Sequence, residues 1–187
     1  MAPSPKLKRD YIYYGFFSLH LASILLVDLV PLYPESYWAN PKSIFRFLLW
    51  IREYYIATFN DPFFKVAHDT LPPWYKLFTY LEIAIQIPMS FWIRAQCGDS
   101  KEGTTPGFEL ASVAYGVQVA LTTLVCVWDV AYWDPVEYSV QDKSMFVFGL
   151  YGPFVLIPLI FSVDMGRRLL GRIEAAEATT EVAKKTQ

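Results

Sequence analysis

The chain has 187 residues, of which 54% are hydrophobic and 18% aromatic, and its formal net charge is −2. This composition is too apolar for an ordinary soluble domain of this length and predicts a membrane protein with one domain. The weak net charge and the lack of a basic stripe or a nucleic-acid motif exclude nucleic-acid binding. Cys97 and Cys126 lie at or inside apolar runs, so we expect neither disulfides, nor a metal site, nor a cofactor.

The first apolar run extends from Tyr11 to Leu32 and follows a short basic tail. It is longer than the core of a secretory signal, which has about 7 to 15 apolar residues, and we therefore expect a retained membrane span. Basic residues before the span favour a cytosolic N-terminus. The span carries two candidate site residues, His20 and Asp28.

Residues 33–73 form a long connection. Asn40-Pro41 has the pattern of an N-cap followed by proline at the first helical position, and apolar residues then recur at helical spacing. This predicts an amphipathic helix that lies on the membrane or over the mouth of a bundle, with Arg52 away from its apolar face. Asn60-Asp61-Pro62 is a turn signal, and these residues alone favour a structural role for Asp61.

The second predicted span, Trp74–Ile93, has a polar face formed by Thr79, Glu82 and Gln86. These residues lie three and four positions apart, which places them on one side of a helix. A carboxylate at membrane depth costs about 2.5 to 3.5 kcal/mol, so Glu82 should face a protein interior rather than lipid. Pro88 removes one helical hydrogen bond and should bend the helix beside this face.

Two further spans are predicted, from Pro106 to about Trp128 and from Met145 to Val163. A mildly polar stripe on the third span includes Thr122. The fourth span should be bent and closely approached by a neighbouring helix because it contains Gly149, Gly152, Pro153 and Pro158. The predicted fold class is therefore an all-α membrane protein, a four-transmembrane-helix bundle with an amphipathic helix in the first lumenal connection.

Four spans place both termini on one side, and the excess of basic residues there predicts that this side is cytosolic. The predicted parts are a tail of residues 1–8, a membrane domain of residues 9–166 and a second tail of residues 167–187. The chain ends in Lys184-Lys185-Thr186-Gln187. These lysines resemble the dilysine signal for retrieval to the endoplasmic reticulum, which predicts the coat-retrieval machinery as a partner.

Asp28, Asp61 and Glu82 are acids on three different segments and form the candidate site. Two carboxyl groups in a low-dielectric pocket cannot both ionise cheaply, so one of them would keep its proton. Such a pair fits a cationic amine whose apolar body packs on aromatic walls, and Tyr151 is one candidate wall.

Each of these residues also has a structural interpretation. Asp28 could snorkel to headgroup water, and the aromatic residues could form an interfacial belt. His20 could act as an acid or base, but a single histidine in an apolar span more often makes an interhelical hydrogen bond.

Several short motifs together resemble the EXPERA-domain membrane proteins, and within them the sigma-2 receptor branch, over about residues 9–166. They are Asp28, Asn60-Asp61-Pro62, Pro72-Pro73-Trp74-Tyr75-Lys76, Glu82-x-x-x-Gln86-x-Pro88 and Tyr151-Gly152-Pro153-x-x-x-Ile157-Pro158. The resemblance implies a multi-pass protein of the endoplasmic-reticulum membrane, a homodimer, with a lipid-accessible pocket for sterols, oxysterols or cationic amphiphiles and a role in sterol trafficking or homeostasis. In that branch, the positions matching Asp28 and Asp61 form the acidic pair, and those matching Glu82 and Gln86 line the pocket. The candidate ligand-binding residues are Asp28, Asp61, Glu82, Gln86, Thr79, His20, Thr122 and Tyr151.

Two alternatives stay open. The family includes sterol isomerases, in which the pattern resembles a histidine and a glutamate four residues apart on the first domain helix. Here His20 is followed four positions later by Ile24, so we expect a protein without enzymatic activity. The other alternative is a quality-control or targeting factor for client proteins, because certain fungal relatives are linked to mitochondrial precursor targeting.

Overall fold

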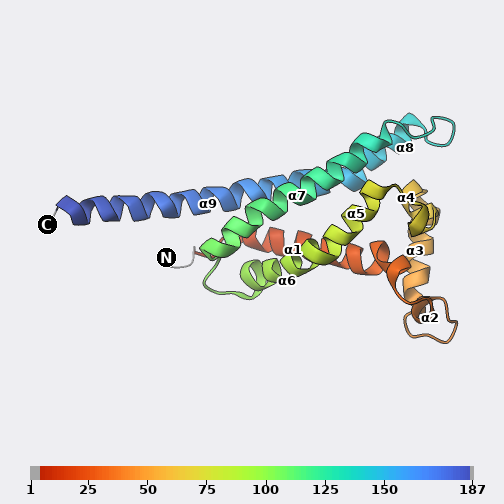
Figure 1. Cartoon of the computed structure of the whole chain (residues 1–187), viewed down its shortest axis with the longest axis horizontal. Helices are drawn as coiled ribbons and strands as arrows, with labels where there is room; N and C mark the ends of the chain where they lie inside the picture. Colours follow the sequence, from red (N-terminus) through yellow and green to blue (C-terminus); the bar gives the residue numbers. More distant parts are fainter. Residues whose placement is uncertain (1–4, 186–187) are drawn as a thin grey trace. The chain divides into compact units, whose positions relative to one another are not determined.

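The computed structural model describes the backbone of residues 5–185 and, within it, the side chains of all residues except 182, 183 and 185. In this part of the chain the regular structure is helical, without a strand (Figure 1). Three helical stretches are long and apolar enough to cross a membrane, namely Lys8–Asp28, Pro106–Val130 and Val140–Glu181. They correspond to the first, third and fourth predicted spans.

The second predicted span is helical without a break from Pro73 to Asp99, but it is not among these three stretches. Lys76, Glu82 and Arg94 lower its hydropathy. That this helix crosses the membrane, and that four helices form a bundle, therefore stay predictions.

The chain divides into two compact units. One combines the N-terminal end as far as Tyr13 with the chain from Ala95 onward, and the other contains Tyr14–Arg94. The first unit holds α7 (Pro106–Val130), α8 (Val140–Ser144) and α9 (Gly152–Lys185). The second holds most of α1 (Lys8–Ser23) together with α2 (Glu35–Trp38), α3 (Arg46–Phe59), α4 (Pro62–Lys65), α5 (Pro73–Leu81) and α6 (Ile87–Ile93).

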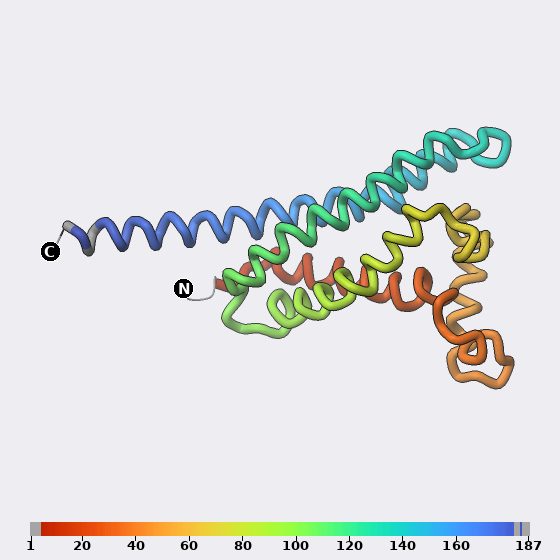
Figure 2. The backbone as a smooth tube through the Cα atoms, in the orientation of Figure 1, coloured from red at the N-terminus to blue at the C-terminus, as the bar shows by residue number. Residues whose placement is uncertain are grey.

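In the first unit α7 and α9 lie side by side (Figure 2). The closest approach is at Gly116, where an added Cβ atom would lie 2.5 Å from the carbonyl oxygen of Pro158 and 2.8 Å from Cβ of Ser162. The hydroxyl of Ser162 donates a 3.0 Å hydrogen bond to the carbonyl of Val113. A neighbour does approach the fourth predicted span closely, but the glycine that permits it is on α7 and not on that span.

Buried ion pairs connect both α1 and α7 to α9. Asp10 is fully buried, and a guanidinium nitrogen of Arg168 lies 2.6 Å from its carboxylate and 2.7 Å from that of Asp164. Glu109 is also fully buried and forms a bidentate ion pair with Arg172. Its two carboxylate oxygens lie 2.8 and 3.0 Å from guanidinium nitrogens of that arginine. The buried carboxylates of Asp10 and Glu109 each have an arginine partner, and this pairing compensates the cost of burying their charge.

In the second unit the amphipathic helix begins later than predicted. The side chain of Asn40 accepts a 2.9 Å hydrogen bond from the N–H of Lys42 and closes a turn instead of capping a helix, and α3 begins at Arg46. Ile44, one of the apolar residues of the predicted helix, precedes α3 and is 82% exposed. The predicted end is correct, because α3 stops at Phe59 and is followed by Asn60 in the left-handed conformation (φ 58°).

Short π-helical turns lie within or at the ends of the long helical stretches, at Ile24–Asp28, Glu82–Gln86, Arg94–Asp99 and Met145–Tyr151. In the second of them the N–H of Ile87 donates to the carbonyl of Glu82, five residues earlier. Two of the turns end shortly before a proline, Pro88 or Pro153. A widened turn relieves the clash between a proline ring and the carbonyl four residues before it, so the helix continues past each proline.

Candidate functional site

Asp61 lies at the junction of α3 and α4 and is fully buried. Its Oδ1 atom accepts a 3.0 Å hydrogen bond from the N–H of Phe63, which makes Asp61 the N-cap of α4, with Pro62 at the first helical position. Its Oδ2 atom accepts a 3.0 Å hydrogen bond from the hydroxyl of Tyr55 on α3. The structural role expected for Asp61 is therefore present, and its carboxylate also joins two helices.

Tyr55 is half-buried. Burial and the nearby charge of Asp61 raise the pKa of Tyr55 above its usual value. The phenol therefore keeps its proton at physiological pH and is a stable hydrogen-bond donor to Asp61.

Arg52 lies one helical turn before Tyr55 on the same face of α3. Its guanidinium donates to the carbonyl of Val27 at 3.3 Å and to that of Phe64 at 2.8 Å, and it lies over the Phe64 ring, 5.3 Å from the centroid. The guanidinium also interacts electrostatically with Asp28 and Asp61. Burial lowers the pKa of Arg52, but a guanidinium titrates so high that it stays charged.

Asp28 ends the π-helical turn Ile24–Asp28 and is half-buried. Its carboxyl interacts electrostatically with Asp61 and with Arg52, and Glu82 in turn interacts with Asp28. Three acids that are far apart in the sequence therefore form one cluster inside the second unit. We call Asp28, Asp61 and Glu82 the acidic cluster.

Gln86 lies one turn after Glu82, at the end of the π-helical turn Glu82–Gln86, and is buried. Its Oε1 atom lies 2.8 Å from Nε2 of His20, which is buried on α1. An amide oxygen can only accept a hydrogen bond, so Nε2 of His20 is the donor and carries a proton. His20 thus makes the interhelical hydrogen bond that the sequence favoured.

The three remaining candidates have other surroundings. The hydroxyl of Thr79 is buried and donates to the carbonyl of Tyr75 in its own helix, at 3.3 Å. Thr122 donates to the carbonyl of Val119 at 3.0 Å, and Tyr151 ends the π-helical turn Met145–Tyr151. Thr122 and Tyr151 belong to the first unit, and their part in a ligand site stays a prediction.

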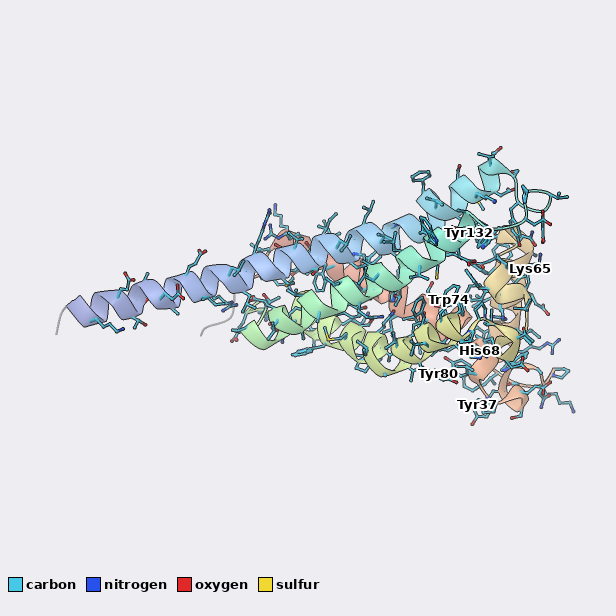
Figure 3. All side chains as sticks on the ribbon, turned by 45° about the horizontal axis from the view of Figure 1, so that its top comes forward. Tyr37, Lys65, His68, Trp74, Tyr80 and Tyr132 are labelled. Carbon is cyan, nitrogen blue, oxygen red and sulfur yellow. The ribbon has the colours of Figure 1, made fainter. Side chains whose placement is uncertain are left out.

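A cavity of about 490 Å³ opens in the second unit, and Arg52, which interacts electrostatically with Asp28 and Asp61, is part of its lining. It is lined by Val30, Pro31, Leu32, Trp38, Arg52, Val66, Ala67, His68 and Asp69. Cavities of this size hold small ligands, and apolar walls with a few polar groups are typical of such sites. His68, labelled in Figure 3, is half-buried here.

Sequence reasoning missed Arg52 and Tyr55 and placed Arg52 away from the apolar face. Arg52 follows Leu48 by four residues and precedes Tyr55 by three, a spacing that puts all three on one side of a helix. Leu48 is buried and Arg52 and Tyr55 are half-buried, whereas Trp50 on the opposite side is 66% exposed. The i, i+4, i+7 pattern was the signal that could have found Arg52.

The acidic cluster and its neighbours Arg52, Tyr55 and Gln86 supply carboxyl, guanidinium, phenol and amide groups, which form hydrogen bonds and ion pairs. Within the described residues, no group of three or more histidine, cysteine, aspartate or glutamate side chains could hold a metal ion.

Comparison with known proteins shows similarity to a family and to individual relatives. Residues 47–165, which include Asp61 and Glu82, match a family described as EXPERA (EXPanded EBP superfamily). A protein of Schizosaccharomyces pombe named "Efficient mitochondria targeting-associated protein 19" is 28% identical over 176 residues, which cover 94% of this chain and 85% of that protein. The "Sigma intracellular receptor 2" of Xenopus tropicalis is 24% identical over 161 residues, covering 83% of this chain and 86% of the receptor.

Proposed function

Because the chain belongs to the EXPERA family, we propose that it binds a sterol or a similar amphiphile at the acidic cluster. The observation that carries this proposal is the convergence of Asp28, Asp61 and Glu82 in one unit. Acids near or inside membrane segments are costly and mark functional sites by default. The likeness to a protein named as an intracellular receptor supports the same conclusion.

The three acids have different parts in this proposal. Asp61 is held by the N–H of Phe63 and the hydroxyl of Tyr55, so we assign it the role of fixing the geometry of the cluster. Asp28 and Glu82 are the groups we assign to the polar head of the ligand. His20 and Gln86, joined by their hydrogen bond, hold α1 against the helix that carries Glu82.

We place this activity in the endoplasmic-reticulum membrane, in sterol trafficking or homeostasis. The three candidate spans support a multi-pass protein, and we propose that the helix from Pro73 to Asp99 is the fourth. We further propose cytosolic termini, a homodimer and retrieval by the coat machinery. Lys184 is exposed at the end of α9, whereas the side chain of Lys185 and residues 186–187 lie outside the described part of the chain.

The direct test is binding of a radiolabelled oxysterol to the purified protein. Asp28→Asn and Glu82→Gln should each weaken binding by about tenfold, because each replaces a carboxyl group that bonds the polar head of the ligand by an amide. Glu53→Gln is the matched control, since Glu53 is exposed on α3 and its loss should leave affinity unchanged. Undiminished binding by both cluster variants would remove the proposed site.

We propose binding without catalysis, and complementation of an isomerase-deficient yeast strain tests this distinction. The protein should not rescue growth. Rescue that is lost with Glu82→Gln would assign proton transfer by the acidic cluster and overturn the non-enzymatic proposal.

A second candidate function is a targeting or quality-control factor for client proteins. It is favoured by the likeness to the S. pombe protein named for efficient mitochondria targeting, which extends over 94% of this chain. Proximity labelling in sterol-depleted cells separates the two functions. Contacts with client proteins should persist without sterol if this candidate is correct and should fall if sterol binding controls them.

A further inference from the structure

Arg52 is a cation that the chain itself places beside the acidic cluster. It is half-buried, and its guanidinium bonds to the carbonyl just before Asp28 and to the carbonyl three residues after Asp61. These two bonds hold the charge between the segments that carry the two acids. Removing a guanidinium from water is costly unless acceptors and negative charges replace the water. The two carbonyls and the two carboxyl groups supply that replacement.

The position of this charge matters for what the acidic cluster can bind. A cluster of carboxyl groups attracts an ammonium ion only as far as its negative charge is uncompensated, and Arg52 compensates part of it. An ammonium that reached the cluster would also be repelled by the guanidinium at short range. A neutral hydroxyl group meets neither penalty, since it can donate to a carboxylate and accept from a donor.

The cavity beside the cluster leads to the same conclusion. Arg52 lines it, so its charge also opposes a cation that approaches from there. The other titratable groups in the lining are His68 and Asp69. Burial and the charge of Lys76 lower the pKa of His68, which is therefore neutral at physiological pH, and Asp69 is an exposed carboxylate that offsets part of the positive charge.

We propose that Arg52 is a specificity-determining residue, an internal cation that makes the acidic cluster prefer uncharged hydroxylated amphiphiles to cationic amines. This inference rests on the proposed function, because it concerns the ligand class of the same site. It reverses the preference for a cationic amine that the acids alone predict.

A matched pair of steroids tests the proposal. Cholesterol and 3β-amino-5-cholestene differ at one position, where the first has a hydroxyl and the second an amine that is protonated at pH 7.4. Binding of both is measured on the purified full chain in lipid nanodiscs. The wild-type protein should bind cholesterol more tightly, and equal or tighter binding of the amine would overturn the proposal whatever the variants do.

Arg52→Met, Arg52→Lys and the control Arg46→Met complete the experiment. Arg52→Met should tighten amine binding by about tenfold while cholesterol affinity stays within about threefold, because it removes only the repulsive charge. Arg52→Lys should keep the wild-type ratio, and so should Arg46→Met, since Arg46 is exposed on the same helix. A folded Arg52→Met protein with the wild-type ratio of cholesterol to amine affinity would show that Arg52 has only a structural role, as the donor to two carbonyls.

The melting temperature of each variant is measured first. If Arg52→Met does not fold, Arg52→Gln takes its place, because its amide retains a donor without the charge. Failure of the proposed function looks different from failure of this inference. Cholesterol binding that is absent, or insensitive to Asp28→Asn, refutes the site itself, whereas an unchanged steroid ratio with Asp28-dependent binding refutes only the role of Arg52.

Discussion

The hydroxyl of Tyr55 donates a 3.0 Å hydrogen bond to Oδ2 of Asp61, across the turn that separates α3 from α4. The same carboxylate caps α4 through the N–H of Phe63. The side chain of Asp61 thus caps α4 and, through Tyr55, also fixes the face of α3 that carries Arg52.

Tyr55→Phe should therefore destabilise the protein by about 1 to 2 kcal/mol, because Asp61 is buried and loses a charge-assisted hydrogen bond. Thermal unfolding in detergent measures the effect. Tyr54→Phe is the control, since Tyr54 is 62% exposed, and it should change stability by less than about 0.5 kcal/mol. Equal effects of the two substitutions would mean that the Tyr55 bond contributes nothing.

Gly116→Ala should destabilise the α7 and α9 pair by about 1 to 3 kcal/mol or more, because the new methyl group would lie 2.5 Å from a backbone oxygen that cannot move alone. Gly107→Ala, also on α7, is the matched control because no atom lies within 4 Å of its added Cβ. Unfolding of the two variants in mild detergent compares them. A tolerated Gly116→Ala would contradict the close packing of the two helices.

Arg168→Met should cost about 3 to 5 kcal/mol, because it leaves the fully buried Asp10 without its cation. Asp10→Asn combined with Arg168→Met should recover part of this loss, which a double-mutant cycle measures by thermal unfolding. Arg167→Met removes a neighbouring exposed arginine and should be nearly neutral. A double variant no better than Arg168→Met alone would argue against the buried pair.

Gly152→Ala should disturb the π-helical turn before Pro153, because its Cβ would lie 2.7 Å from the carbonyl oxygen of Val147. Gly149→Ala has only Met145 near its Cβ, at 3.8 Å, and should be tolerated. Amide hydrogen exchange over residues 145–153 measures the difference. Faster exchange in the first variant alone is the expected result, and equal protection in both would show that the turn does not require glycine.

The local parts of this structure follow from the sequence. Each correctly predicted element depends on the residues of its own segment alone. These elements are the first, third and fourth predicted spans and the turn at Asn60-Asp61-Pro62. The free energies of membrane insertion, helix capping and proline placement are set within a few residues. Where two local signals compete, as in the turn at Asn40 that delays α3 to Arg46, the prediction was wrong.

The candidate site could likewise be predicted only in part from the sequence. Asp28, Glu82 and Gln86 could be named because polar groups are costly in apolar helices. The side of α3 that carries Arg52 was assigned wrongly, because apolar and aromatic residues on the other sides of that helix obscure the spacing of Leu48, Arg52 and Tyr55. The pairing of Asp10 with Arg168 joins residues 158 positions apart.

The sequence by itself predicted helices apolar enough to enter a membrane, the turn at Asn60-Asp61-Pro62 and the acids whose burial needs an explanation. Only the tertiary structure decided that Arg52 and Tyr55 belong beside those acids and that Asp10 needs Arg168. The physical reason is that burying a side chain in an apolar helix has a local cost, whereas the partner that compensates it comes from a distant segment.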